Sequence, residues 1–588
     1  MESSRSESSP KDLLITGLAE VATPLGSTPR CGAEQGKLHR LRSAEVLCRA
    51  GRIAFVGTPE ERRQRFGELA DVERLNGNGG TLIPGFVDPH THLDAQLCWD
   101  GTVAPSNLHG FTSVVIGLCG FGIAPAPAGG AEYLLRSLER VEEIPYDSTI
   151  LGVPFTWSTW SEYFAFVRAQ PLALNVAGFV PHSALRYFAM GDRARGERAT
   201  ATDRAVMVAE LQQAIATGAL GFATSRGPNH VDGYGDPVPS RFADDEELQA
   251  LVAACTGRTW QVNVEAKFGG DAVAINAEVS RYAEWSRRAG ARLTWSPFHA
   301  EFTDAVWPDV LSHNHDLNAS GVTVAPQVSA LPISVLLRWD EPSFVARLGG
   351  WESILGGFFD LSVDARLALL ADPATRRALE SADPNARFAP RFDEWVLAAS
   401  PSAPELVGLT IAEAAGRRNR GAVDFLCDTV IADKLATLVQ VMVANRNRVG
   451  AQALMVDSGT LLALGDAGAH VMSVTNYRYP TYILRELVVN QKQLALEHAV
   501  ALMTSRPAQF YGLGNRGELR VGAAADICVV DPNELAVGAV RVVHDLPGGA
   551  PRLYQGARGY RAVFVAGECT IDNDTPTDAR PGTVLQSA

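Results

Sequence analysis

Short apolar runs alternate with longer helix-like segments through most of this 588-residue chain, from about Leu82 to Val500. Eight runs have the length and composition of buried strands: LIPGFVDPH, SVVIGL, LNVAGFVPH, LGFATS, WQVNVEA, RLTWSPF, VTVAPQV and LLALGD. The segments between them, such as DAVAINAEVSRYAEWSRRAG, repeat apolar residues at helical spacing. Strands that alternate with helices form parallel sheets, because each helix carries the chain back across the sheet. The pattern therefore predicts an α/β fold, a (β/α)8 TIM-type barrel.

The two ends of the chain differ from this middle part. Both contain short strand-like runs with turns between them, which predicts one small β-domain built from both termini. The stretch 331–449 has helices and few strand signals, so it is expected to be a helical insertion in the barrel. The expected division is a disordered tail at 1–10, β-domain parts at 11–82 and 514–571, a barrel at 83–513 and a closing tail at 572–588.

The bulk composition narrows the class of protein. A formal net charge of -14 opposes general binding to nucleic acids or anionic membranes, because phosphate is repelled at long range. The eight cysteines form no CxxC pair, which favours reduced thiols. The polar start MESSRSESSPKD is unlike a signal peptide, and no run of about 18 apolar residues predicts a membrane span. These absences point to the cytoplasm. The partners that remain open are a small-molecule substrate and, because large surface loops permit assembly, a second copy of the chain in a homo-oligomer.

The clearest local signal for chemistry is the stretch Asp88-Pro89-His90-Thr91-His92. In a strand, residues i and i+2 point to the same side, so His90 and His92 can direct two imidazoles at one cation. The structural alternative is a pair of surface histidines.

Two further signals stand at the ends of other predicted strands. Asp466 follows LLALG, where its carboxylate could bind metal and accept a proton from water. Cys119 follows SVVIGL, where a thiolate could bind metal. A helix N-cap for Asp466 and a buried thiol for Cys119 are the structural alternatives.

Several longer motifs resemble the N-acyl-D-amino-acid deacylase (D-aminoacylase) branch of the amidohydrolase superfamily. They include GFVDPHTHLDAQ, HGFTSVVIGLCGFGIAP, GALGFATS, LGDAGAH, TSRPAQFYGL and RGELRVGAAADICVVDP, and the resemblance spans roughly residues 12–570. It implies a (β/α)8 barrel beside a small β-sandwich made from both termini, with zinc as the usual metal. It also implies that His90, His92, Cys119 and Asp466 are metal ligands, and that Asp466 is the catalytic residue that shuttles protons.

The chain departs from the branch at two positions. The branch has a histidine at the end of strand five and another at the end of strand six. Here Asn263 stands in the first place, and Pro297 or Phe298 in the second. Glu265, Lys267 or His299 could substitute as ligands. We therefore expect one zinc ion held by His90, His92, Asp466 and Cys119; a second ion would need such a substitute.

Candidate substrate contacts are His182, Arg226, His230, Lys267 and His299. His182 lies at a strand end in a stretch that resembles a VGHxxLR motif of the branch, and His230 lies in a loop rich in Gly and Pro. Arg226 could bind a substrate carboxylate through two hydrogen bonds. A helix cap, a solvated loop and a surface ion pair are the respective alternatives.

Three functional hypotheses follow. The first is a metal-dependent hydrolase that uses a metal-activated water to cleave the amide bond of an N-acylated amino acid of the D series, or of a similar small amide. The second is a hydrolase of cyclic amides such as hydantoins and dihydropyrimidines. The third is a non-catalytic binding protein descended from the same fold, which the missing histidines would favour.

Overall fold

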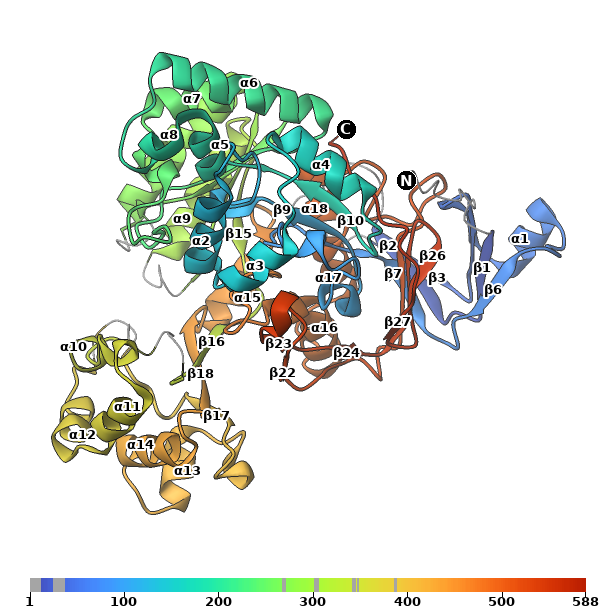
Figure 1. Cartoon of the computed structure of the whole chain (residues 1–588). Coiled ribbons are helices and arrows are strands. Elements are labelled where there is room, and N and C mark those ends of the chain that lie inside the picture. The colour runs from blue at the N-terminus through green and yellow to red at the C-terminus, as the bar shows by residue number, and fades with distance from the viewer. Residues whose placement is uncertain are drawn as a thin grey trace. The chain divides into compact units, whose positions relative to one another are not determined.

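The computed structural model describes residues 12–24, 38–266, 271–300, 306–340, 345, 348–384, 386 and 389–587. The chain forms two compact units. One consists of Pro332–Arg448 with Met472–Val474, and the other contains the remaining residues. Each is described by itself (Figure 1).

The larger unit contains two parallel sheets, in the orders β10-β9-β8 and β11-β12-β13-β14-β15-β19. Each of the eight predicted runs contributes to them. Phe179 alone separates β10 from β11, so the two sheets are joined by one continuous segment. The strands are β8 (Phe86–Asp88), β9 (Phe111–Ile116), β10 (Asn175–Gly178), β11 (Val180–Pro181), β12 (Gly221–Ser225), β13 (Thr259–Asn263), β14 (Arg292–Ser296), β15 (Val324–Val328) and β19 (Leu461–Leu462).

These sheets constitute a mixed α/β fold of the TIM-barrel type, but the strands do not form one closed sheet as predicted. Between the first and last strands the contact is a single parallel bridge, Thr91 to Ala467, beyond the ends of β8 and β19. The strand β19 has two residues, which is too short for a continuous ladder along β8.

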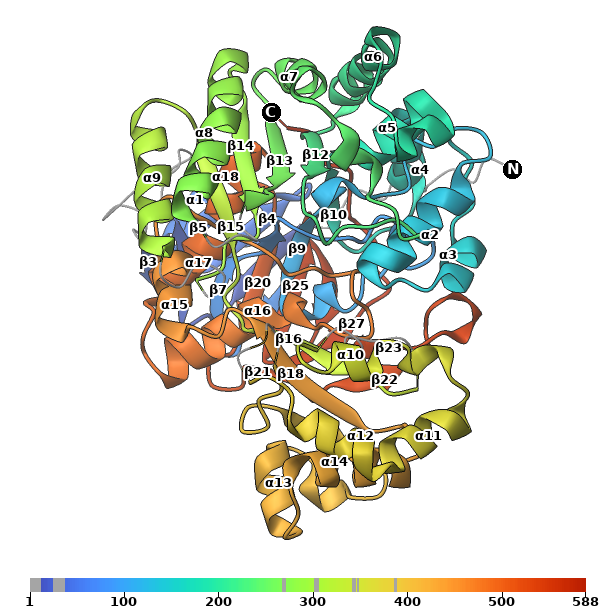
Figure 2. The same cartoon turned by 90° about the vertical axis from the view of Figure 1, so that its left-hand side faces the viewer.

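Helices cover the strands on the outside (Figure 2). The helix α6 (Ala201–Thr217) contacts β12, α8 (Ala272–Ala289) contacts β14, and α9 (Trp307–Ala319) contacts β15. Local sequence sets their ends: α6 begins at a capping box, and α8 ends at a left-handed glycine. The other helices of this unit are α1 (Pro59–Phe66), α2 (Ala131–Glu142), α3 (Tyr146–Gly152), α4 (Trp160–Ala169), α5 (His182–Met190), α7 (Asp245–Ala253), α15 (Arg448–Val456), α16 (Tyr479–Tyr482), α17 (Leu496–Met503) and α18 (Ser505–Tyr511).

Strands from both ends of the chain share one seven-stranded sheet, in the order β27-β26-β25-β20-β7-β2-β3. A second sheet, β5-β4-β1-β6, comes from the N-terminal part alone, and apolar residues of the two sheets form one core cluster. The strands are β1 (Leu13–Thr16), β2 (Glu20–Pro24), β3 (Leu38–Arg42), β4 (Glu45–Arg49), β5 (Arg52–Gly57), β6 (Glu73–Asn76), β7 (Thr81–Pro84), β20 (Ile527–Val530), β25 (Tyr560–Val565), β26 (Glu568–Asp572) and β27 (Thr575–Pro576).

The predicted first barrel strand, LIPGFV, is divided between two sheets. Its first half belongs to β7, which pairs with β20, and its second half to β8, which pairs with β9. The break falls at Gly85, where a Cβ atom would lie 2.2 Å from the side chain of Thr112. A glycine is required here because the backbone approaches Thr112 so closely.

The smaller unit has its own core of buried aromatic and aliphatic residues, including Trp339, Trp351 and Trp395. A three-stranded sheet, β16-β18-β17, lies among five helices of the described residues. The elements are β16 (Ile333–Leu337), β17 (Val396–Ala399), β18 (Leu438–Ala444), α10 (Glu352–Leu355), α11 (Val363–Ala371), α12 (Pro373–Glu380), α13 (Ile411–Arg417) and α14 (Ala422–Ala432). None of the helices in the described ranges combines the length and apolar character needed to cross a bilayer.

A buried histidine in the larger unit predicts a pH-dependent stability. The imidazole of His109 lies between the Thr481 hydroxyl and the Gln555 carbonyl, at 2.8 and 2.9 Å. Burial lowers the pKa of His109 to about 4, below the 6.5 of the unfolded chain. The unfolded state therefore binds more protons between these values, so acidification from pH 6.5 to 4 destabilises the fold by up to about 3 kcal/mol.

His109→Gln should remove this contribution, because an amide does not titrate. Urea unfolding of both proteins at pH 7 and pH 4.5 measures it as the difference between their pH dependences. Equal losses of unfolding free energy in the two proteins would contradict the assignment.

Candidate metal centre

The turns that follow β8 and β19 lie side by side, and they carry the histidine pair and Asp466. The backbone N–H of Asp466 donates to the carbonyl of His90 at 3.2 Å, and that of His92 donates to the carbonyl of Ala467 at 2.8 Å. Asp466 itself has a left-handed backbone, with φ 48°. These contacts bring an early and a late part of the chain together.

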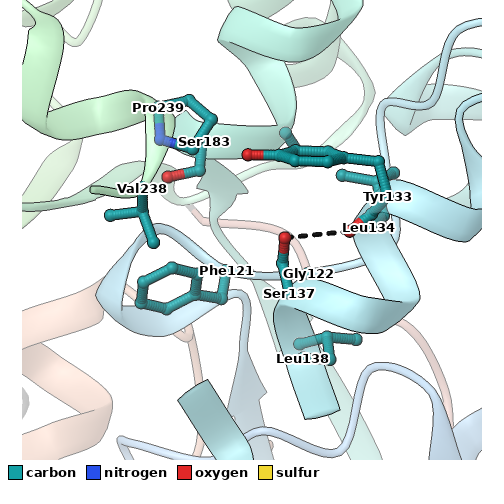
Figure 3. A pocket seen from close by; sticks show the side chains of 10 residues that line it. Phe121, Gly122, Tyr133, Leu134, Ser137, Leu138, Ser183, Val238 and Pro239 are labelled. Carbon is teal, nitrogen blue, oxygen red and sulfur yellow. Dashed lines mark hydrogen bonds between the residues drawn. The ribbon is translucent and has the colours of Figure 1, made fainter. Parts of the chain in front are cut away.

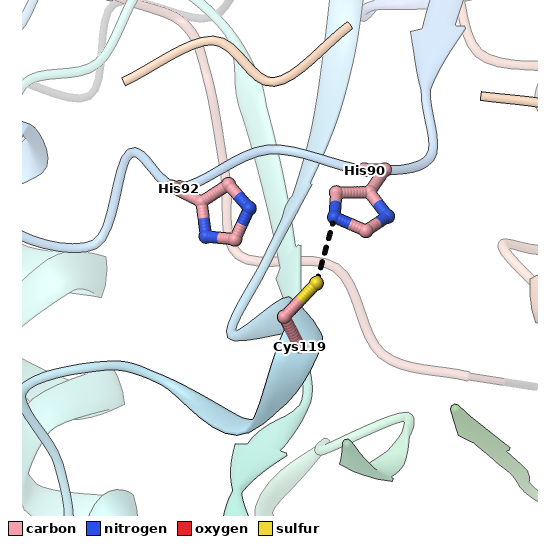
Figure 4. Close-up of side chains that lie close together, drawn as sticks. All are labelled: His90, His92 and Cys119. Atoms are coloured by element: carbon pink, nitrogen blue, oxygen red, sulfur yellow. Dashed lines mark hydrogen bonds between the residues drawn. The ribbon is translucent and has the colours of Figure 1, made fainter. Parts of the chain in front are cut away.

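Four predicted side chains meet at this point, and Figure 4 shows three of them, His90, His92 and Cys119. The Nε2 atom of His90 lies 3.4 Å from the Cys119 sulfur and 3.6 Å from Oδ1 of Asp466. One ligand atom each from His90, His92 and Cys119 lies within 4.8 Å of the others, and all three residues are buried. Asp466 is more open, with 20% of its side chain exposed.

A strained turn positions the sulfur of Cys119. The residue has a left-handed backbone, with φ 52°, in the short turn after β9. Such a conformation costs a β-carbon-bearing residue about 1–3 kcal/mol and persists where the surroundings fix it. Here the Cys119 N–H donates to Oε1 of Gln261 at 3.0 Å, and Nδ2 of Asn263 lies 3.7 Å from the sulfur. Asn263, which stands in place of the expected strand-five histidine, therefore contacts the centre through Cys119.

Two side chains that sequence reasoning missed support the imidazoles. Nδ1 of His90 lies 2.5 Å from Oε1 of Gln327, on β15, and Nδ1 of His92 lies 3.2 Å from Oε1 of Glu142, the last residue of α2. If each Nδ1–H donates to its partner, Nε2 keeps the lone pair that a metal needs. Gln327 is the penultimate residue of a predicted strand, and this position near a strand end could have marked it as a candidate. Glu142 lies in a helix, where no such sequence signal exists.

Burial sets the protonation of two side chains at the centre. Burial, together with the nearby His90, His470 and His230, lowers the pKa of His92 well below its usual value and keeps its imidazole neutral. Burial also raises the pKa of Glu142 to about 8. Neutral imidazole and thiolate are the forms that bind metal.

This donor set suits a divalent metal. Two buried imidazoles and one thiol converge with a carboxylate, and a mixture of nitrogen, sulfur and oxygen donors is typical of zinc. The partners behind His90 and His92 match the usual arrangement of a ligand held by an amide or carboxylate oxygen.

The five candidate substrate contacts lie in different surroundings. Both ring nitrogens of His182 are engaged inside the protein, with Thr224 at 2.8 Å and Glu247 at 2.7 Å. Arg226 uses Nη1 to bind the carbonyls of residues 240, 241 and 243. His299 is buried just after β14, and Lys267 lies outside the described residues.

His230 is linked to the centre through Phe121. Its ring packs edge-on against Phe121, two residues beyond Cys119, at 5.1 Å between centroids. Its Nδ1 atom lies 2.6 Å from the Ser225 hydroxyl, and it is among the residues that lower the pKa of His92.

Comparison with known proteins decides the family. A sequence model of the amidohydrolase family matches residues 75–347 and 360–571, which is most of the chain. The chain belongs to the amidohydrolase family. This confirms the resemblance seen in the sequence motifs, and it means that the protein is an enzyme acting on carbon–nitrogen bonds other than peptide bonds.

This amidohydrolase is similar to two deacylases of Alcaligenes xylosoxydans xylosoxydans along nearly its whole length. The N-acyl-D-glutamate deacylase is 28% identical over 546 residues, covering 91% of this chain and 93% of that protein. The N-acyl-D-aspartate deacylase is 26% identical over 562 residues, covering 92% and 91%.

Among solved structures, an N-acyl-D-glutamate deacylase from Bordetella bronchiseptica has a similar fold. It was solved with zinc and a phosphonate inhibitor, and it matches with a TM-score of 0.63 at 23% identity, covering 98% of this chain and 100% of that one. At this identity the similarity establishes the mixed α/β fold of the TIM-barrel type.

Proposed function

We propose that this amidohydrolase uses zinc to hydrolyse the amide bond of an N-acylated amino acid of the D series. The observation that carries the proposal is the convergence of His90, His92, Cys119 and Asp466, of which Asp466 is the most exposed. The two deacylases whose names specify N-acyl-D-amino acids support the substrate class.

His90, His92 and Cys119 would hold the cation, with Asp466 completing the set. When bound, the cation would polarise the amide carbonyl and lower the pKa of the attacking water from about 15.7 towards 7. Gln327 and Glu142 keep the two imidazoles oriented by accepting their Nδ1 protons.

Asp466 moves the proton. Its carboxylate lies 3.6 Å from Nε2 of His90 and reaches solvent, so it can contact both water and substrate. It accepts a proton from water as the oxygen attacks the amide carbon. It then delivers the proton to the amide nitrogen as the carbon–nitrogen bond breaks, which releases a carboxylate and a free amine.

His230 is our candidate for a contact with the substrate. It lies in the loop between β12 and α7, and its ring touches Phe121 beside the centre. Arg226 lies at the base of the same loop, where its contacts with three carbonyls hold the loop in place.

Metal analysis and a substrate panel test the proposal. Protein purified without chelator should contain about one zinc per chain, and removal of the metal should abolish hydrolysis until zinc is restored. The panel compares N-acetyl-D-amino acids, N-acetyl-L-amino acids and cyclic imides. Turnover restricted to cyclic imides would favour the hydantoinase alternative, and absence of both metal and turnover after zinc addition would favour a binding protein.

A further inference from the structure

A small cavity lies in the larger unit between α2, the start of α5 and the loop that follows β12 (Figure 3). The side chains around it are mainly apolar. They are Phe121, Tyr133, Leu134, Leu138, Ala184 and Val238, with Gly122, Ser137, Ser183 and Pro239 completing the wall.

Two connections link the wall of this cavity to the metal centre. Phe121 lies two residues after Cys119, and its ring contacts His230. Leu134, Leu138 and Glu142 are spaced four residues apart on α2, so they lie along one face of the helix. Because Glu142 contacts His92 at 3.2 Å, Leu138 in the cavity wall lies one helical turn from the side chain that supports a metal ligand.

The chemistry of the wall excludes a charged occupant. None of the ten described residues that line the cavity is charged. The Ser137 hydroxyl donates to the carbonyl of Tyr133 within the helix, and the Ser183 oxygen accepts from the N–H of Ser240. A carboxylate placed here would lose its hydration without gaining a cation as partner.

The cavity is also narrow. The centre of a water molecule could move through only about 10 Å³ of it, and about that much room is needed to hold a single water. A methyl group has a similar size, whereas a longer chain would have to displace the side chains of α2 or of the loop.

We propose that this cavity, the Phe121 pocket, receives a small uncharged apolar group of the substrate and so limits its length. The inference rests on the proposed function, because the group is carried by the amide that is hydrolysed. It can be the alkyl end of the acyl group or the side chain of the amino acid. In either case the pocket provides no site for an acidic side chain.

Two substrate series identify the group. One keeps the amino acid constant and lengthens the acyl group from formyl through acetyl and butyryl to hexanoyl. The other keeps the acetyl group constant and lengthens an unbranched side chain from D-alanine to D-norleucine, with D-glutamate as the charged member. A pocket limit appears as a fall in kcat/KM of at least about 10-fold at one step in one series, since one methylene is worth about 10–200-fold.

Variants of α2 then test the wall. Leu138→Ala enlarges the pocket and should raise kcat/KM for the first excluded member, relative to that for the smallest member, by about 10-fold or more. Ser137→Leu fills the pocket and should act in the opposite direction. Val141→Ala shortens a side chain of the same helix that does not line the pocket, so it is the matched control and should keep the wild-type profile.

Binding separates failure of the pocket from failure of the proposed function. Calorimetry with acetamide, butyramide and hexanamide, on wild type and on Leu138→Ala, needs no turnover. Suppose that no substrate is hydrolysed, but that amide affinity depends on chain length and that this dependence changes in Leu138→Ala. The pocket assignment is then supported and the proposed function is contradicted. If Leu138→Ala and Val141→Ala give the same profiles in both binding and hydrolysis, the pocket assignment is overturned.

Discussion

Asp466→Asn should lower kcat/KM by about 10³-fold or more, because it removes both a carboxylate donor and the group that accepts and returns the proton. General acid–base catalysis by a positioned side chain contributes about 10²–10⁴-fold on its own. Asparagine has nearly the same shape as aspartate, and the side chain is already 20% exposed, so the fold should persist. Steady-state kinetics with the best substrate of the panel and circular dichroism measure the two effects.

Asp457→Asn is the matched control. Asp457 is also an aspartate on the late part of the chain, its side chain is 21% exposed, and it pairs with His315 rather than with the metal centre. It should retain activity within a few-fold of the wild type. Activity of Asp466→Asn near the wild-type level, with metal bound, would remove Asp466 from the mechanism.

His90→Ala should abolish metal binding and turnover together. Nε2 of His90 lies near both the Cys119 sulfur and the Asp466 carboxylate, so its loss removes the donor that lies between these two. We expect the zinc affinity to fall by more than the 10–100-fold that is typical of losing a residue behind a ligand. Competition with a chromophoric chelator measures this affinity directly.

Gln327→Leu provides the graded comparison for His90→Ala. Gln327 contacts Nδ1 of His90 and, through its Nε2, the Tyr511 hydroxyl at 3.3 Å, but it does not offer an atom to the metal. The zinc affinity should fall by about 10–100-fold in this variant. A larger loss of zinc affinity in Gln327→Leu than in His90→Ala would contradict the assignment of His90 as the ligand and Gln327 as its support.

The sequence predicted those parts of the fold that depend on local pattern. All eight apolar runs contain strands, because each is short, mainly apolar and bounded by turns. The division of LIPGFV between two sheets could not be predicted from such a local pattern. It depends on Thr112, which approaches Gly85 from a neighbouring strand.

The candidate site shows the same limit. His90 and His92 are two residues apart, so their common direction could be derived from strand geometry. The support from Glu142 could not, since Glu142 is the last residue of the helix α2, about 50 positions away in the sequence, and no local pattern links it to His92. His182 shows the opposite case: it directly follows β11 and begins α5, yet a carboxylate from α7, Glu247, engages its Nε2 atom inside the protein.

The helix α2 contacts both the metal centre and the Phe121 pocket. Its last residue, Glu142, contacts His92, while Leu134 and Leu138 on the same face form part of the cavity wall. A bulky substrate that pushes α2 outward would therefore also pull the carboxylate away from the imidazole. A variant that accepts larger substrates would then be expected to bind the cation less tightly. Its metal affinity should therefore be measured together with its activity.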